Sequence, residues 1–295
     1  MGINFNHLVS FNEFKNDAPR ETKKQVFKLA EQVMTPVFQQ STYRQFSTFI
    51  ITTTCPDSLA PSLGQALADK FNDELGSAQI IDMVQGCAGG VSSMILASQL
   101  AASKKEPVLL VNTDAAKKAT SASSKIHEIF SNGSFACVVE SDNGSKGLLH
   151  SRSQQYKGLS DVVTVKLGHD ADQYIMGKKD IASDPRKHLG LEMNQLMALR
   201  LLRKAEEFFN DFVSESEKPD VLLLHQVNPY ILSKLEKLFS KYQVEFINVA
   251  DQIGNCGSAT TGLAFHMTFD QMKGKKVMIC SFGTGGLITA GMWQF

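Results

Sequence analysis

The sequence contains few cysteines, and their arrangement excludes two common structural roles. Five cysteines are scattered over 295 residues, and none belongs to a Cys-x-x-Cys pair. An odd number of distant cysteines argues against a disulfide framework and against a zinc site. We therefore expect no metal site, and each thiol has to be judged by its neighbours.

The chain also lacks long apolar runs and a net charge. Its longest apolar runs, such as Val108–Val111 and Val221–Leu224, are far shorter than the about 20 residues that span a bilayer. The first residues do not have the charged and then apolar pattern of a secretory signal. The 30 basic and 30 acidic residues balance, so no overall field attracts nucleic acid or an anionic membrane. We expect a cytoplasmic protein that binds neither of them.

What the sequence does contain is an alternation of predicted strands and helices. Hydrophobic residues make up 43% of the chain and charged residues 20%, as in ordinary globular domains. Short β-branched and apolar runs predict strands, amphipathic runs predict helices, and their alternation is typical of an α/β fold. The predicted strands are 46–54, 79–84, 107–112, 135–140, 148–153, 162–166, 221–224, 245–249, 276–281 and 287–294, and the predicted helices are 21–38, 63–75, 91–102, 189–213, 230–242 and 258–272.

The predicted elements fall into two halves with the same plan. A strong turn signal at Asp142-Asn143-Gly144-Ser145 lies near the midpoint of the chain. On both sides of it, a buried strand leads through a turn with polar residues into a helix. No sequence repeat accompanies this layout. We predict two similar halves, residues 1–145 and 146–295, that pack as one body.

Cys87 follows a predicted strand and immediately precedes a predicted helix, in the segment Gln85-Gly86-Cys87-Ala88-Gly89-Gly90. The unpaired N–H groups and partial positive charge of a helix N-terminus stabilise a thiolate. The small neighbours allow a substrate carbonyl to approach the sulfur closely. Considered alone, a buried structural cysteine explains this residue equally well.

Two polar residues in the second half complete a possible catalytic set. His225 follows four apolar residues, so its ring should emerge at the carboxyl edge of a buried strand, where α/β sheets bind ligands. Asn255 lies in the turn Gly254-Asn255-Cys256-Gly257, where its amide can donate to an oxyanion. Alone, a core histidine and a turn-forming asparagine are the commoner interpretations. Because cysteine, histidine and asparagine occur together in this order, a shared catalytic site is the better interpretation of the three residues.

At these motifs the chain resembles the β-ketoacyl-ACP synthase III family of the thiolase superfamily. The resemblance covers about residues 45–295, and three motifs in the right order make it specific. A fourth segment, near the C-terminus, is similar to the closing glycine-rich loop of the family. The matching segments are Ile81-Asp82-Met83-Val84-Gln85-Gly86-Cys87-Ala88-Gly89, His225-Gln226-Val227-Asn228, Gly254-Asn255-Cys256-Gly257-Ser258-Ala259 and Ser281-Phe282-Gly283-Thr284-Gly285-Gly286.

The resemblance implies a fold and a set of roles. The fold is a thiolase-like α/β structure of five layers, αβαβα, made of the two similar halves. Cys87 is the nucleophile that becomes acylated, and His225 and Asn255 hold the thioester carbonyl of the second substrate and stabilise the enolate formed on decarboxylation. The backbone N–H of Cys87, with one from Thr284 or Gly285, forms the oxyanion hole for acyl transfer.

The resemblance also implies substrate contacts. Asn228 matches a position that contacts the pantetheine arm in the family. At the position of Leu59 and Ala60, members of the family can have a bulky residue that reaches across the dimer and forms the bottom of the acyl pocket. The smaller groups of this chain predict a longer or differently shaped acyl chain, although ordinary repacking explains them as well.

The implied function is acyl transfer to Cys87, followed by decarboxylative Claisen condensation with a malonyl-type thioester in specialised fatty-acid or polyketide-like metabolism. Acyl-CoA or an acyl carrier protein delivers the acyl groups, and no cofactor is bound permanently. The expected assembly is a homodimer, or a heterodimer with a related ketosynthase. The alternatives are a same-fold acyltransferase that forms an ester or amide, and a non-catalytic scaffold subunit of a heterodimer.

Two departures from the family mark the chain as divergent. Residues 1–45 contain neither a clear opening strand nor the Arg- and Trp-bearing stretch that grips the adenine end of coenzyme A in the family. We therefore expect weak coenzyme A binding or delivery by a carrier protein. The Gly-Asp-Gly-Ala-Gly-Ala run of the family is replaced by Ser131-Asn132-Gly133-Ser134-Phe135-Ala136.

Overall fold

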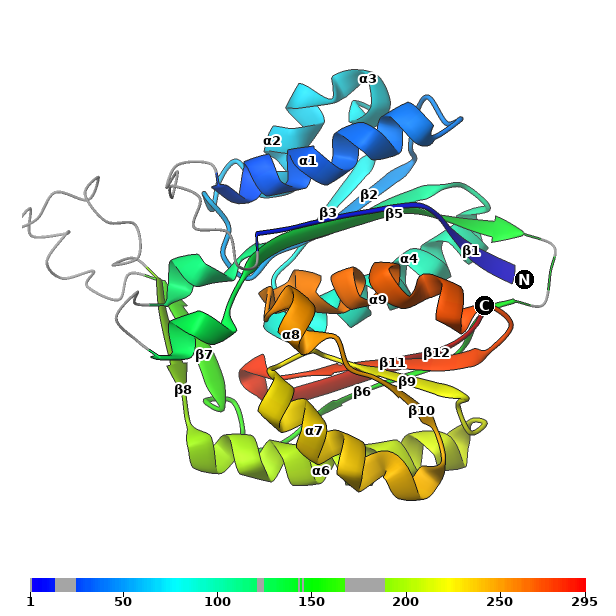
Figure 1. Cartoon of the computed structure of the whole chain (residues 1–295). Coiled ribbons are helices and arrows are strands. Elements are labelled where there is room, and N and C mark those ends of the chain that lie inside the picture. Colours follow the sequence, from blue (N-terminus) through cyan, green and yellow to red (C-terminus); the bar gives the residue numbers. More distant parts are fainter. Residues whose placement is uncertain (1, 14–24, 121–124, 143, 145, 168–188) are drawn as a thin grey trace, which may run out of the picture.

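The computed structural model of the chain describes residues 2–13, 25–120, 125–142, 144, 146–167 and 189–295. Helices and sheets alternate in five layers (Figure 1). One five-stranded sheet comes from strands before residue 143 and the other from strands after residue 146. The predicted αβαβα layering is therefore confirmed.

The first sheet consists of β1 (Gly2–Asn12), β5 (Asn132–Asp142), β4 (Val108–Ala115), β2 (Thr48–Thr52) and β3 (Gln79–Met83), in that order. Strands β4, β2 and β3 are parallel, whereas β5 is antiparallel to both β4 and β1. The carboxyl ends of the three parallel strands therefore meet at one edge of the sheet. Cys87 follows β3 at this edge.

The second sheet consists of β10 (Glu245–Ile247), β9 (Val221–Leu224), β11 (Lys276–Phe282), β12 (Leu287–Gln294) and β6 (Gly147–Gln155), in that order. Strands β10, β9 and β11 are parallel, and β12 is antiparallel to both β11 and β6. His225 directly follows β9, and Gly283 directly follows β11. The parallel strands thus bring these two residues to the same edge.

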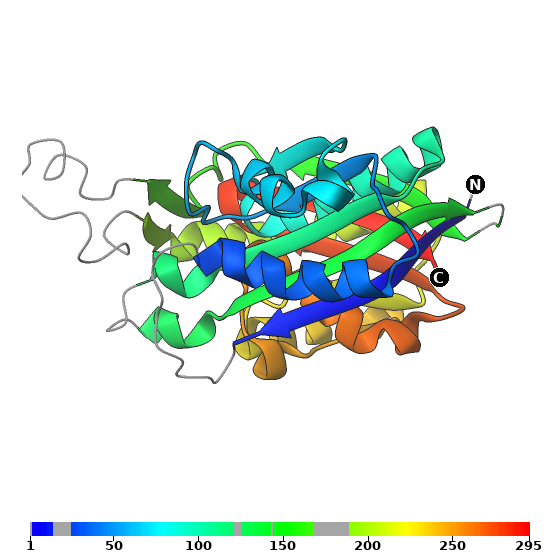
Figure 2. The same ribbon diagram turned by 90° about the horizontal axis from the view of Figure 1, so that it is seen from above.

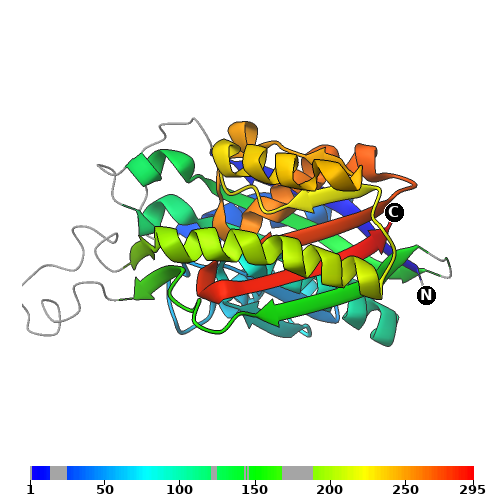
Figure 3. The same ribbon diagram turned by 90° about the horizontal axis from the view of Figure 1, so that it is seen from below.

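The helices occupy three layers around and between the sheets. Figure 2 shows the helices between β1 and β3 over the outer face of the first sheet, and Figure 3 shows α6 and α7 across the outer face of the second. No helix among the described residues is long and apolar enough to cross a membrane. The outer helices are α1 (Gln25–Gln40), α2 (Leu63–Lys70) and α3 (Asn72–Leu75) on the first sheet and α6 (Gln195–Glu215) and α7 (Pro229–Phe239) on the second, while α4 (Gly89–Lys104) and α9 (Thr260–Met272) lie between the sheets and α8 (Ala250–Ile253) is a short helix before α9.

The middle layer contains an aromatic cluster that joins both sheets. Phe265 of α9 contacts Phe5 of β1 and Phe295 at the C-terminus, with ring centroids 5.4 and 5.3 Å apart. Phe5 in turn lies 6.3 Å from the ring of Trp293 on β12. Because α9 packs against a sheet on either side, it is apolar on more than one face.

A small antiparallel pair, β7 (Val163–Leu167) and β8 (Leu189–Met193), lies at one end of the molecule. The prediction of one helix over residues 189–213 was wrong in its first part. Residues 189–193 pair with β7, because tertiary pairing overrides local helical preference. Asn194 then begins α6, and its side chain accepts a hydrogen bond from the backbone N–H of Met197 at 3.1 Å.

The expectation that residues 1–45 contain no opening strand was also wrong. Residues 2–12 form β1, which pairs with β5 along most of its length. The register shifts between Asn6 and Val9, and His7 has a φ of 51°. This bulge interrupts the two-residue alternation by which a strand is recognised in a sequence.

We expect Phe265→Ala to lower the free energy of unfolding by about 3 to 5 kcal/mol, because it empties a fully buried aromatic site between the two sheets. The matched control on the same helix is Met267→Ala, since Met267 is 47% exposed. The control should change stability by no more than about 0.5 kcal/mol. Urea unfolding monitored by circular dichroism measures both, and equal effects would contradict this account of the core.

Candidate active site

Cys87 lies in a tight turn between β3 and α4. The residues Gly86–Ala88 form a single 3-10 turn that runs directly into the helix. Gly86 has a φ of 56°, and a Cβ atom there would lie 1.7 Å from Oγ1 of Thr284, so only glycine fits. Oγ of Ser281 donates a hydrogen bond of 2.7 Å to the carbonyl oxygen of Cys87. The turn is therefore held against β11 of the second sheet.

His225 is a buried histidine whose ring makes no hydrogen bond with the described residues. The residue is only 1% exposed, and neither ring nitrogen has a partner within the described part of the chain. Its backbone N–H donates to the carbonyl oxygen of Cys280 at 2.8 Å, and its ring stands edge-on to Phe282. A buried polar group without a protein partner is uncommon, and both ring nitrogens of His225 therefore keep their full capacity for hydrogen bonds.

Asn255 is held in place by its own turn. Its side-chain oxygen accepts hydrogen bonds from the backbone N–H of Gly257 at 3.0 Å and from Oγ1 of Thr260 at 3.3 Å. Its amide nitrogen donates to the carbonyl oxygen of Val227 at 3.3 Å. A carboxamide has two N–H groups, so one N–H is not needed for the bond to Val227.

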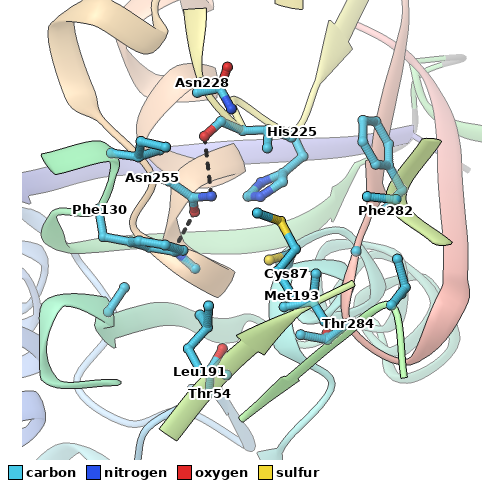
Figure 4. Close-up of a pocket in the computed structure, with 18 of the residues that line it drawn as sticks. Thr54, Cys87, Phe130, Leu191, Met193, His225, Asn228, Asn255, Phe282 and Thr284 are labelled. Carbon is cyan, nitrogen blue, oxygen red and sulfur yellow. Dashed lines mark hydrogen bonds between the residues drawn. The ribbon is translucent and has the colours of Figure 1, made fainter. Parts of the chain in front are cut away.

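The three predicted catalytic residues line the same cavity. Figure 4 shows Cys87, His225 and Asn255 facing one another across it, although they come from loops far apart in the sequence. The cavity has a volume of about 400 Å³, within the range of small-molecule sites. Its walls are mainly apolar and include Phe130, Val162, Leu191, Leu201, Leu202 and Ile231.

Burial determines the charge states of the site. It raises the pKa of Cys87 to about 12, an effect that the nearby Asp114 increases and that hydrogen bonds from the backbone N–H groups of Thr284 and Cys87 oppose. Burial also lowers the pKa of His225 to about 4. Near pH 7 the resting site therefore contains a neutral thiol and a neutral imidazole.

Of the two loop residues predicted to supply an oxyanion donor, the cavity contains one. Thr284 lines it, and its backbone N–H acts to lower the pKa of the Cys87 thiol. Gly285 does not line it, and its carbonyl oxygen accepts a hydrogen bond from the side chain of Gln155. Gly283 is the glycine that faces the thiol, because a Cβ atom there would lie 3.4 Å from Sγ of Cys87.

Of the three residues predicted to contact substrate, one lines the cavity and two do not. Asn228 lines the cavity, and its side-chain oxygen caps α7 by accepting a hydrogen bond from the backbone N–H of Ile231 at 2.8 Å. Leu59 is 74% exposed, and neither Leu59 nor Ala60 lines the cavity of its own chain. Their predicted contact crosses a dimer and involves a second copy, so it stays a prediction.

Sequence reasoning missed two residues of the cavity. Asp114 lies near the end of β4 and is fully buried, and Cys55, which is 1% exposed, lines the cavity as well. The available signal for Asp114 was an acidic residue two positions after the predicted buried strand 107–112, near the carboxyl end of a strand as His225 is. Among the described residues, no group of three or more His, Cys, Asp or Glu side chains is arranged to hold a metal ion.

The lowered pKa of His225 predicts a loss of stability in mild acid. The unfolded chain binds a proton near pH 6.5, but the folded protein does so only near pH 4, so stability falls as the pH falls through this window. Between pH 6.5 and pH 4 we expect the free energy of unfolding to fall by about 3 kcal/mol more in wild type than in His225→Gln. This figure follows from the difference of about 2.5 between the pKa values of His225 in the unfolded and folded protein. Urea unfolding at both pH values measures this difference, and equal losses would show that His225 is not desolvated.

Comparison with known protein families gives a match in the C-terminal part of the chain. Residues 214–295 match the family model described as 3-oxoacyl-[acyl-carrier-protein (ACP)] synthase III C terminal. This segment contains His225, Asn255 and the glycine-rich loop after β11. No curated protein sequence matches the chain.

Solved structures extend the likeness to the whole chain. A 3-oxoacyl-(acyl carrier protein) synthase III from Pseudomonas aeruginosa PAO1 has a TM-score of 0.77 at 13% identity, covering 100% of this chain and 98% of that one. Germicidin synthase from Streptomyces coelicolor, a type III polyketide synthase, has a TM-score of 0.71 at 19% identity, covering 91% and 72%. A variant of OleA from Xanthomonas campestris has a TM-score of 0.75 at 11% identity, covering 100% and 98%. The resemblance to β-ketoacyl-ACP synthase III enzymes that the motifs predicted is therefore confirmed, and the chain has their thiolase fold.

Proposed function

We propose that the protein is a ketosynthase III-type condensing enzyme. It transfers an acyl group from a thioester to Cys87 and then joins that group to a malonyl-type thioester with loss of CO₂. One observation carries the proposal: a thiol, a neutral imidazole and a carboxamide line a single, mainly apolar cavity. The family match over residues 214–295 and the shared fold support it.

The first step is acylation of Cys87. Sγ attacks the thioester carbonyl while the neutral imidazole of His225, whose ring nitrogens lack partners among the described residues, accepts the thiol proton. Negative charge develops on the carbonyl oxygen, next to the backbone N–H groups of Cys87 and Thr284. The C–S bond of the donor then breaks, and its thiolate leaves with the proton from His225.

The second step is condensation. The bond between the malonyl methylene and its carboxylate breaks, CO₂ leaves, and the electron pair moves onto the thioester oxygen. The neutral imidazole of His225 and the amide of Asn255 each donate a hydrogen bond to this oxygen, and such preorganised donors are worth roughly 3 to 4 kcal/mol each. The enolate carbon then attacks the acyl carbonyl and releases the Cys87 thiolate, which recovers a proton from water.

The cavity wall favours the decarboxylation of a bound malonyl group. Among the described residues that line the cavity, Asp114 is the one side chain with a formal charge, so no lysine or arginine meets a malonyl carboxylate there. A carboxylate without a cation in an apolar site is costly. Decarboxylation moves its charge onto an oxygen that His225 and Asn255 can stabilise.

Because the walls are apolar, we also propose that the acyl group transferred to Cys87 is apolar. Delivery by coenzyme A or by an acyl carrier protein, a dimeric assembly and a place in specialised fatty-acid or polyketide-like metabolism belong to the same proposal.

Acylation is tested by intact-protein mass spectrometry after incubation with a panel of acyl thioesters. We expect wild type to gain the mass of one acyl group, and Cys87→Ala to gain none because the nucleophile is gone. The matched control is Cys137→Ala, which removes a buried thiol in β5 outside the cavity and should leave the adduct in place. An adduct that persists in Cys87→Ala would exclude Cys87 as the acyl carrier, and no adduct on wild type would favour a scaffold subunit.

Condensation is tested by release of ¹⁴CO₂ from a malonyl thioester added to the acylated protein. Asn255→Ala should still form the acyl adduct but should release CO₂ about 10² to 10³ times more slowly, because one donor to the enolate oxygen is lost. A product that is an ester or amide, formed without CO₂, would instead identify an acyltransferase of the same fold.

A further inference from the structure

Asp114 is a buried carboxylate that the proposed chemistry does not use. It has no solvent exposure and lies near the end of β4, on the wall of the cavity. Its Oδ2 atom accepts hydrogen bonds from the backbone N–H of Thr54 at 3.1 Å and from the backbone N–H and Oγ of Ser258 at 2.9 and 3.0 Å. Three donors therefore converge on one carboxylate oxygen.

The partners of Asp114 belong to two different parts of the molecule. Thr54 follows β2 in the first sheet, whereas Ser258 lies in the turn that carries Asn255 and leads into α9. Gly257, between Asn255 and Ser258, has a φ of 56°, and a Cβ atom there would lie 2.3 Å from Oδ2 of Asp114. The turn therefore rests directly on the carboxylate.

The same turn also touches the helix that follows Cys87. A Cβ atom on Gly90, in the first turn of α4, would lie 2.3 Å from the carbonyl oxygen of Ser258. The other end of the turn is fixed from a separate direction, because the backbone N–H of Asn255 donates to the carbonyl oxygen of Ile129 at 2.9 Å. Asp114 thus fixes the side of the turn that faces the nucleophile.

We propose that Asp114 is a positioning residue for the condensation step, which acts through Ser258 and Gly257 to hold the Asn255 carboxamide opposite Cys87. The inference rests on the proposed function. It assigns no contact with substrate to Asp114. Its effect is geometric, since a displacement of about 1 Å in a donor can cost about 10²-fold in rate.

Two substitutions separate the hydrogen bonds of Asp114 from its charge. Asp114→Asn keeps an oxygen that can accept from Thr54 and Ser258 but removes the charge, and charged acceptors make the stronger bonds. Asp114→Ala removes the acceptor altogether. We expect CO₂ release to fall less than tenfold in Asp114→Asn and about 10- to 100-fold in Asp114→Ala, with no fall in the acylation rate of Cys87 in either variant.

A double-mutant cycle tests whether Asp114 acts through Asn255. If it does, Asp114→Ala should cost no further rate of CO₂ release in the Asn255→Ala background. Multiplicative losses would overturn the proposal. Should Asp114→Ala fail to fold, Ser258→Ala removes one of the three donors and should show a smaller loss of the same step, again absent in the Asn255→Ala background.

Two readouts do not depend on knowing the substrate. Hydrogen exchange of residues 254–260 should speed up in Asp114→Ala relative to wild type, because Ser258 loses its anchor. In Asp114→Asn, alkylation of Cys87 by iodoacetamide should begin at lower pH, because the negative charge that raises the pKa of the thiol is gone. The other titratable groups on the cavity wall are Cys55 and His225, with the phenol of Tyr230, and all three remain in this variant.

These readouts also distinguish a failure of the proposed function from a failure of the positioning role of Asp114. If wild type forms no acyl adduct and releases no CO₂, the proposed function fails, whereas unchanged exchange and an unchanged alkylation profile in the variants overturn the role of Asp114. A merely structural role would predict a different pattern, in which acylation and CO₂ release decline together with the melting temperature.

Discussion

The close approach of the two halves at the start of α4 is the constraint on which the site depends. Three loops meet there, after β3, β9 and β11, and a fourth comes from the turn before α9. The approach is possible because Gly86 and Gly90 lack side chains where Thr284 and the backbone of Ser258 pass. Without this contact the thiol, the imidazole and the carboxamide would belong to separate surfaces.

The burial of the site at this contact has two effects of opposite sign. It makes the resting thiol and imidazole neutral and leaves the imidazole without a partner among the described residues, which costs stability. It also strengthens every interaction with charge that develops during a reaction, because the surroundings cannot screen it. The cost to the resting fold and the benefit to the chemistry thus have one cause.

The sequence predicted well the features that depend on order along the chain and poorly those that depend on pairing in space. Cys87, His225 and Asn255 could be predicted because each follows a recognisable strand or glycine turn and their order matches a family. The strand β1 could not, since its bulge at His7 breaks the alternation, nor could β8, which needs β7 as a partner. The place of Gly285 outside the cavity depends on the local path of a glycine loop, which the motif alone does not determine.

The cavity is bounded by two kinds of element. The reactive groups lie on loops at the sheet edges, whereas much of the apolar wall comes from the β7–β8 pair and from α6, at the periphery of the fold (Figure 1). If the proposed function holds, substitutions in that outer wall change the length or shape of the acyl group that fits, while Cys87, His225 and Asn255 stay in place. The proposed reaction and the choice of acyl group thus depend on different segments of the chain, so a substitution can alter one without altering the other.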